Sequence, residues 1–237
     1  GGLPEGRIDF ATNPGGGVAG TAALKPYEEG RAQLQLSPVR FSVDGAGRGQ
    51  FRTVAVLDGP LPDGMVRGLK APLDIRLSAQ GQISLATQCM PVSWASFALS
   101  GLTLDPATVR LCGVDDGRLG TGALALAGRL GSNPLRFTAA STRYSINSGN
   151  FELTQPDVRI GEADSPVRLA AASLQGAVRL QGGLEGTIMA GQGRIGTVPL
   201  DLTQIDGRWT FARSRLDVTG SLRVSDTQAE PRFNPVT

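Results

Sequence analysis

Alternation of apolar and polar residues, repeated along the chain and interrupted by short glycine-rich segments, constrains the fold of this sequence more than any other feature. It is clearest over residues 71–80, where Leu73, Ile75 and Leu77 alternate with polar residues. A period of two places successive side chains on opposite faces of a β-strand. No stretch of a dozen residues has the period of an amphipathic helix. The chain is therefore expected to be all-β with little helix.

The same pattern recurs as on the order of fifteen short strands separated by turn residues. Strands joined by short turns pair with their predecessors in an antiparallel meander, and strand twist curls a long one. The apolar positions are mostly aliphatic, with only 5% aromatic residues in the chain. A closed sandwich normally has a bulkier core. The sequence therefore predicts an elongated, curled meander of the β-taco or repeating β-groove kind, with an apolar inner face.

The length of 237 residues allows one elongated domain or two small ones, and the composition, with 33 glycines and 15 prolines, favours one elongated domain. Residues 1–31 are expected to be a loop-rich segment, with the glycine run 15–17 in its middle and room for a short helix over 22–30. Residues 32–237 are expected to form a single elongated β-groove domain.

Cys89 and Cys112 are the only cysteines, and two strand-like runs lie between them. A glycine at 101 and an Asp-Pro pair at 105–106 indicate that the chain turns back, which would bring the two thiols together. Two buried free thiols are also compatible with the sequence. Because the pair brackets a hairpin and no metal ligands accompany it, a disulfide in an oxidising compartment is favoured. Such a bridge contributes about 3 kcal/mol in the loop-entropy model.

The sequence has no histidine, so histidine-based triads and histidine metal sites are excluded. The acidic pairs at 28–29 and 115–116 are interpreted as solvated turn residues, and the glycine runs at 15–17 and 182–183 as turns or bulges. We therefore expect no enzymatic activity, no metal and no cofactor. A carbohydrate-active β-solenoid would require an acid pair and clustered exposed aromatic residues, which the sequence does not offer.

The net charge of +2 is too small to indicate nucleic acid as a partner. Single arginines recur among the apolar residues and are interpreted as a solvated face. No run of 18 apolar residues is present, so no membrane span is expected. The chain begins without a methionine or a signal peptide, and we expect it to be a section of a longer protein.

Apolar residues on the predicted strands are candidates for lining a groove. Core packing is the favoured alternative for Trp94 and Phe97, where the alternation slips by one residue and indicates a bulge; for Trp209 and Phe211, core and groove lining are equally compatible. The full candidate set is Leu73, Ile75, Leu77, Ile83, Leu85, Trp94, Phe97, Leu135, Phe137, Val167, Leu169, Val198, Leu200, Leu202, Trp209 and Phe211.

A series of short motifs gives the sequence a family resemblance. It comprises Gly59-Pro60-Leu61-Pro62-Asp63-Gly64, the two cysteines, Leu130-Gly131-Ser132-Asn133-Pro134-Leu135, Arg194-Ile195-Gly196-Thr197-Val198-Pro199-Leu200, Gly207-Arg208-Trp209-Thr210-Phe211 and the closing segment 220–236. In this order the motifs resemble the YdbH branch of the AsmA-like, TamB-related proteins of Gram-negative bacteria. The resemblance covers residues 50–237.

The resemblance implies a large envelope protein with an N-terminal inner-membrane anchor and a long periplasmic β-taco. Such a body is thought to carry phospholipids or related lipids, sphingolipids included, between the inner and outer membranes. This chain would be an internal section of that bridge, and the family offers no catalytic motif. The implied partners are lipids, other segments of the same protein and envelope proteins. The alternative is a non-conducting scaffold domain whose apolar faces pack against each other.

Overall fold

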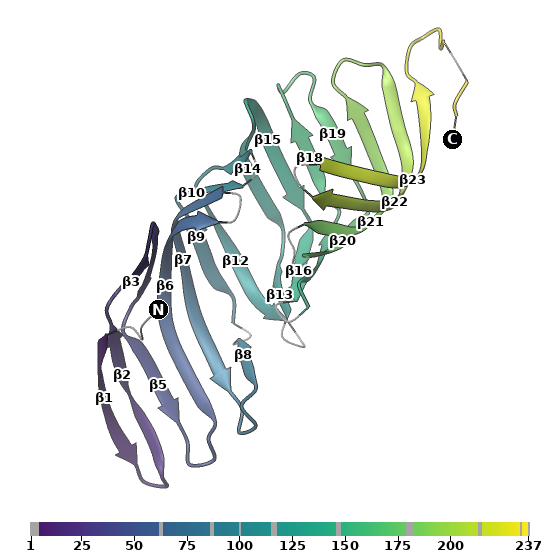
Figure 1. Ribbon diagram of the computed structural model, residues 1–237. Helices are drawn as coiled ribbons and strands as arrows, with labels where there is room; N and C mark the ends of the chain where they lie inside the picture. The colour runs from purple at the N-terminus through teal and green to yellow at the C-terminus, as the bar shows by residue number, and fades with distance from the viewer. Residues whose placement is uncertain are drawn as a thin grey trace. The chain divides into compact units, whose positions relative to one another are not determined.

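The structure is a computed structural model that describes residues 5–61, 64–85, 88–99, 101–114, 118–145, 148–178, 183–212, 215–232 and 234–236. Within these ranges the fold is all-β, and no helix is present that could cross a membrane (Figure 1). The strands are β1 (Gly6–Asn13), β2 (Gly17–Leu24), β3 (Tyr27–Glu29), β4 (Ala32–Leu36), β5 (Val39–Val43), β6 (Gly49–Leu61), β7 (Gly64–Leu77), β8 (Ile83–Leu85), β9 (Met90–Trp94), β10 (Ser96–Leu99), β11 (Leu102–Leu104), β12 (Ala107–Val114), β13 (Arg118–Thr121), β14 (Leu124–Leu130), β15 (Asn133–Ala139), β16 (Ser141–Ser145), β17 (Asn150–Thr154), β18 (Asp157–Ile160), β19 (Val167–Ala170), β20 (Ser173–Val178), β21 (Leu184–Ile195), β22 (Leu200–Ala212) and β23 (Arg215–Asp226).

The chain divides into two compact units. Unit 1 comprises Gly1–Leu99 and Asp105–Gly117, and unit 2 comprises Ser100–Leu104 and Arg118–Thr237. Every strand pair described within a unit is antiparallel, and the strands of each unit follow one another as a curled meander, as the sequence predicts.

In unit 1, β6 and β7 form the longest ladder, paired from Gly49↔Leu77 to Leu61↔Gly64. The strands β4 and β5 both pair with β6, and β8, β9 and β10 all pair with β7. The hairpin of β1 and β2 joins β5 through β2. The last strand of the unit, β12, pairs with β9.

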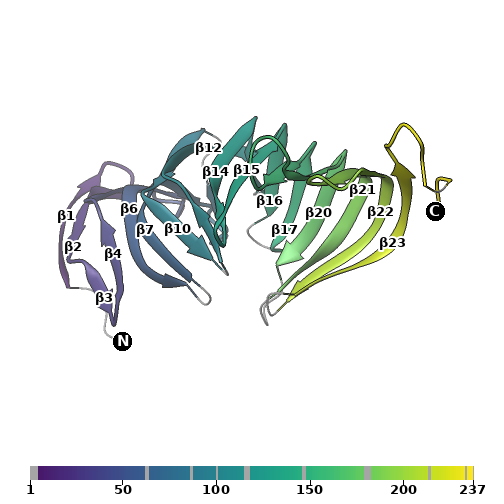
Figure 2. The ribbon, with the colours of Figure 1, turned by 90° about the horizontal axis from the view of Figure 1, so that it is seen from above.

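In unit 2, several pairs of short strands are the two arms of one bent strand. These pairs are β13 and β14, β15 and β16, β17 and β18, and β19 and β20. The last pair of β15 and β18 is Thr138↔Asp157, and the first pair of β16 and β17 is Ser141↔Thr154. Three residues separate the two pairs on each chain segment, so the ladder continues through the break. The same holds for the breaks after β13 and after β19. Later strands bend without breaking, and Figure 2 shows β21, β22 and β23 as curved ribbons.

Three of the bends coincide with residues in an unusual backbone conformation. Gln155, Ala190 and Gln204 have positive φ angles of 50°, 48° and 52°, and they lie on three of the bent strands. An extra residue in this conformation reverses the alternation of side chains, as in a β-bulge, and turns the strand. The row of bends divides unit 2 into two walls.

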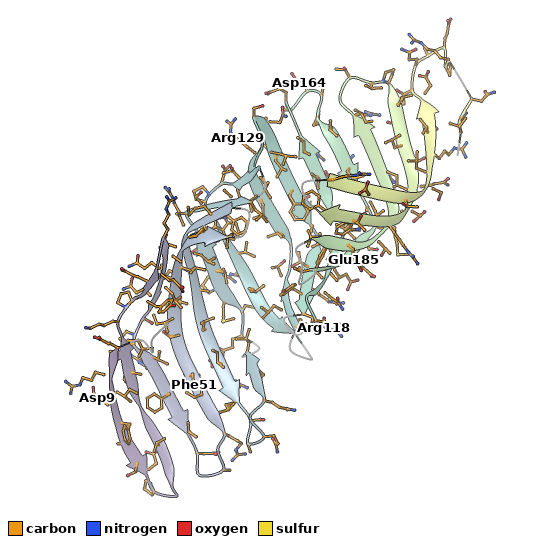
Figure 3. All side chains as sticks on the ribbon, in the orientation of Figure 1. Asp9, Phe51, Arg118, Arg129, Asp164 and Glu185 are labelled. Atoms are coloured by element: carbon orange, nitrogen blue, oxygen red, sulfur yellow. A yellow bond between two sulfur atoms is a disulfide. The ribbon has the colours of Figure 1, made fainter. Side chains whose placement is uncertain are left out.

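We call one wall the β15 wall; it contains β14, β15, β18, β19 and residues 191–195, 200–203 and 223–226 of the last three strands. The other is the β16 wall, which contains β13, β16, β17, β20 and residues 184–189, 205–212 and 215–221. Figure 3 labels Arg129 and Asp164 near the ends of the β15 wall that lie away from the bends.

Residues 1–31 depart from the expectation of a loop-rich segment with a short helix. The strands β1 and β2 pair from Gly6↔Leu24 to Asn13↔Gly17, and β3 follows. The glycine run is the turn of this hairpin, with Gly15 and Gly16 at φ of 102° and 83°. The strands were missed because glycine, alanine and threonine occupy most positions of β2, so the contrast between the two faces is weak.

Residues 32–237 were expected to be a single domain, whereas the contacts within the chain gather into two units. Alternation reports which face of a strand is apolar, but it carries no information on where contacts between strands become sparse. The two-unit division is therefore a property of the tertiary structure.

Candidate functional site

One face of unit 2 is apolar on both walls. On the β15 wall, Phe137, Val158 and Leu169 occupy directly opposed positions across β15, β18 and β19. The row continues through Gly193 of β21 to Leu202 of β22. We call this face, and the apolar face of the β16 wall that it continues into, the inner face of unit 2.

The inner face lies on the concave side of the bend. Ile188, Ile205 and Trp209 of the β16 wall form a buried cluster. Leu202, which precedes the bend at Gln204, packs against this cluster together with Leu174 from β20. Side chains from both walls therefore meet at the bend, so the two apolar surfaces face each other there. The buried cluster fills the space between the walls at the bend.

Trp209 lies over a row of glycines on the β16 wall. Phe151, Gly176, Gly186 and Trp209 occupy opposed positions across β17, β20, β21 and β22. The rings of Phe151 and Trp209 have centroids 6.1 Å apart, and a Cβ added at Gly176 would lie 2.6 Å from Phe151 and 2.9 Å from Trp209. The glycine at 176 is therefore required for the two rings to meet.

Trp209 is only 8% exposed, and its indole Nε1–H has no hydrogen-bond acceptor among the described residues. A buried donor without an acceptor costs about 1–3 kcal/mol. The described contacts of the Trp209 ring are apolar, with Phe151 and the cluster of Ile188 and Ile205.

Away from the bend, the inner face is open to solvent. Val167, Leu169 and Ile195 of the β15 wall remain 44%, 41% and 45% exposed, and Val218 on the edge strand β23 is 56% exposed. Across both units the described residues include no buried polar side chain and few buried apolar ones: Val66, Met90, Leu135, Ala139, Ile188, Ile205 and Trp209. In each unit, apolar side chains of the described inner face are thus exposed.

Unit 1 has an inner face of the same kind. Phe41 and Phe51 are opposed on β5 and β6, with ring centroids 6.5 Å apart, and Ile75 lies opposite Phe51 on β7. The row reaches the edge strand β1 through Gly20, which lies opposite both Phe10 and Phe41. Phe10 is 66% exposed, so this inner face too is open at its edge.

The change of phase predicted after Trp94 is present, and the partner strand β7 changes phase opposite it. Trp94 and Phe97 share the inner face, with ring centroids 6.5 Å apart. In a regular strand, residues three positions apart would point to opposite faces. The facing strand β7 also changes the phase of its side chains, at Gly68, whose φ is 60°. The pairing of β9 and β10 with β7 therefore keeps the same register on both sides of the change. The bulge proper lies between β7 and β6, where Asp58 Oδ1 accepts a hydrogen bond of 2.7 Å from Gly68 N–H.

The structure separates the predicted groove residues into two sets, one in each unit. Val198 lies in the turn between β21 and β22 rather than on a strand, and the side chain of Ile83 lies outside the described residues. In unit 1 the inner face carries Leu73, Ile75, Leu77, Leu85, Trp94 and Phe97. In unit 2 it carries Leu135, Phe137, Val167, Leu169, Leu200, Leu202, Trp209 and Phe211.

Several inner-face residues escaped prediction. Phe151 lies against Trp209, and Ile188 and Ile205 are buried at the bend. Phe151 lies on a regular strand, whereas Ile188 and Ile205 stand within two residues of a change of phase, at Ala190 and Gln204, where simple alternation fails. A search for alternating runs whose phase changes by one residue would have found them.

The outer faces are polar and carry ion pairs. Asp157 of β18 accepts hydrogen bonds from Arg168 Nη2 at 2.6 Å and from Arg159 Nε at 3.1 Å, and its side chain is 18% exposed. Partial burial favours the neutral carboxyl, but the two arginines outweigh this effect and hold the pKa of Asp157 below its ordinary 3.8. Charge thus stabilises the outer face while the inner face relies on apolar contact.

The acidic pair at 28–29 makes local hydrogen bonds. Glu28 accepts a hydrogen bond from Gln33 Nε2, and Glu29 accepts one from the Tyr27 hydroxyl. The pair at 115–116 lies outside the described residues. The described part of the chain contains no group of three or more cysteine, aspartate or glutamate residues placed to hold a metal ion.

Cys89 and Cys112 form a disulfide within unit 1. The bridge continues the β9–β12 ladder, because Met90 and Leu111, the next residues inward, are directly opposed. It therefore closes the end of this pair of strands. A disulfide is typical of proteins in oxidising compartments outside the cytosol.

Comparisons of the chain with protein-family models, with curated proteins and with solved structures find no match.

Proposed function

We propose that the inner faces of the two units bind the acyl chains of lipids in the periplasm of a Gram-negative bacterium. On this proposal the chain is a section of a longer, membrane-anchored bridge of the kind its sequence resembles. The cargo is a phospholipid or a related lipid such as a sphingolipid, passed between the inner and outer membranes. No catalytic step is involved.

The observation that carries the proposal is the half-exposed row of aliphatic side chains on the β15 wall. Val167, Leu169 and Ile195 are too exposed to serve as a core. An apolar surface of this kind without a partner is characteristic of a binding surface. Acyl chains need apolar area and no directional contacts, and each methylene that leaves water contributes about 0.8 kcal/mol.

The character of the lining also suits movement of a lipid along it. The described inner-face positions are mostly leucine, valine, isoleucine and glycine, and no ion pair between the described residues crosses the inner face. A lining that is mostly aliphatic and carries no ion pair holds a chain weakly at each point. The polar head group of a bound lipid can remain in water at the open rim.

The test is native mass spectrometry with lipid extraction on the protein secreted into the periplasm. We expect bound phospholipid or sphingolipid on the native protein and a marked loss from a Leu169→Asp variant. Met189→Asp is the matched control, because Met189 is equally apolar and 54% exposed, but its partner Ser173 places it on the outer face.

Circular dichroism distinguishes loss of lipid from loss of fold in both variants. A native protein free of lipid, or equal lipid on the Leu169→Asp variant, would contradict the proposal. An empty but folded protein would favour the scaffold alternative.

A further inference from the structure

Four arginines stand side by side on the outer face of the β15 wall. The register opposes Arg136 to Arg159, Arg159 to Arg168, and Arg168 to Arg194, on the adjacent strands β15, β18, β19 and β21. We call these residues the arginine row. At the strand spacing of a sheet the row is about 14 Å long. Like charges at directly opposed positions are unfavourable, so the arrangement has a cost for folding.

The acidic residues beside the row offset only part of its charge. Asp157 accepts hydrogen bonds from Arg159 and Arg168, and Asp201 accepts one from Arg194 at 2.9 Å. Arg136 has no ion-pair partner among the described residues. The four guanidinium groups of the row and their two paired carboxylates together carry a net charge of +2.

The guanidinium groups are accessible. The side chains of Arg159, Arg168 and Arg194 are 53%, 48% and 58% exposed. A cavity of about 380 Å³ opens beside Arg168 and Arg194, and its walls also include Gln192 and Thr203, together with Asp164 and Asp201. The row therefore presents charged donors to solvent next to a hollow large enough to hold a phosphate group.

We propose that the arginine row docks this unit on the surface of a bilayer that contains anionic phospholipids, with the guanidinium groups paired to lipid phosphates. Arginine forms paired hydrogen bonds with phosphate and suits this contact better than lysine. The proposal concerns the outer face and is independent of whether the inner face binds acyl chains.

The chemistry around the row favours a membrane over other polyanions. Its outward neighbours are small or polar, for example Ala127, Thr138 and Ala170. A protein interface would need large apolar or aromatic anchors, and a single-stranded nucleic acid would need aromatic side chains for stacking. The described outward positions of this wall offer neither. Binding to an anionic membrane surface requires only positive groups, because each arginine is attracted to the negative headgroups.

The test is flotation of the intact protein with phosphatidylcholine vesicles prepared with and without phosphatidylglycerol. For a surface charge of +2 we expect about a thirtyfold preference for the anionic vesicles at low salt, and loss of the preference at high salt. In an Arg136→Gln/Arg168→Gln variant the row becomes neutral, and the preference should fall at least tenfold.

An Arg7→Gln/Arg215→Gln variant is the control. It removes the same total charge, from arginines that pair with Asp9 and Asp217 within their own strands. If the control loses as much binding as the row variant, or the row variant binds like the native protein, the assignment is overturned. Equal binding to neutral vesicles would also overturn it, by pointing to adsorption through apolar residues. Failure to float, combined with retention on immobilised polyglutamate, would reassign the row to an acidic protein.

Discussion

At the scale of single residues, Trp209 shows that the inner face is selected for apolar contact. Its ring covers two glycines and reaches Phe151, while its indole N–H has no acceptor among the described residues. A residue kept for hydrogen bonding would have a partner. Its ring, rather than its polar group, therefore explains its presence.

We expect Trp209→Ala to lower the free energy of unfolding of unit 2 by about 3–5 kcal/mol, because the buried ring leaves a cavity. Trp209→Phe should cost less than half as much, since phenylalanine keeps most of the contact and removes the unpartnered donor. Urea denaturation followed by circular dichroism measures both. An equal loss in the two variants would show that the indole N–H makes a contact of its own.

Asp157 makes stability depend on pH. Its pKa is lowered in the folded protein, so the carboxylate contributes stability that is fully present above the ordinary value of 3.8 and is lost as the pH falls through the folded value. We expect Asp157→Asn to cost about 1–3 kcal/mol at neutral pH, from hydrogen bonds to charged groups. The difference from the native protein should shrink to nothing in strong acid.

Urea titrations across this pH range measure the effect. Asp217→Asn provides a control, because Asp217 pairs only with Arg215 at an exposed site. A difference at Asp157 that persists unchanged into strong acid would mean that its carboxylate form does not carry the stabilisation.

At the scale of the strand, the bends of β21 and β22 each contain one extra residue. Gln204 at φ 52° and Ala190 at φ 48° each adopt the left-handed region, which residues other than glycine rarely occupy. The reversal of side-chain phase at these points keeps leucine and isoleucine on the inner face in both walls. In β21 and β22 one extra residue thus marks the bend.

We expect Gln204→Gly to be neutral or to stabilise unit 2 by up to about 1 kcal/mol, because glycine adopts a positive φ without strain. Gln204→Val should destabilise by about 1–3 kcal/mol, since a β-branched residue fits that region poorly. The control is Gln175→Val, on the exposed outer face of β20, where a regular strand accepts valine. Thermal unfolding of the three variants compares them. Equal effects of valine at both positions would mean that the positive φ carries no strain.

At the scale of the whole molecule, the two units are stabilised by different means. Unit 1 has the disulfide at the end of the β9–β12 ladder, and unit 2 has the buried cluster at its bend. Neither unit has a large closed core among its described residues. Antiparallel ladders run through both units, and one buried cluster lies at the bend of unit 2.

Reduction of the disulfide should therefore weaken unit 1 by about 3 kcal/mol in the loop-entropy model and leave unit 2 unchanged. Hydrogen exchange with and without reductant measures both units in one sample: amides of β12 should lose protection, while those of β21 and β22 should not. A Cys89→Ser/Cys112→Ser variant should be insensitive to reductant. Equal loss of protection in both units would show that they unfold together.

Much of this architecture was predictable because alternation is a local property. Leu73, Ile75 and Leu77 share a face for the reason the sequence indicates, and the cysteine pair bridges at the end of facing strands. The hairpin of β1 and β2 was missed because small residues blur its two faces. The change of side-chain phase after Trp94 was predictable from the alternation. The matching change at Gly68 of β7 becomes apparent only from the pairing of the strands.

By itself, the sequence determined that the chain forms antiparallel strands with one aliphatic face, because side-chain direction in a strand follows from its period of two. Only the tertiary structure decided that these strands bend in register, that the contacts gather into two units, and that the arginines at 136, 159, 168 and 194 stand in one row. The physical reason is register: residues far apart in sequence become neighbours through hydrogen bonding between strands, and an extra residue in one strand, as at Ala190 and Gln204, shifts which ones meet.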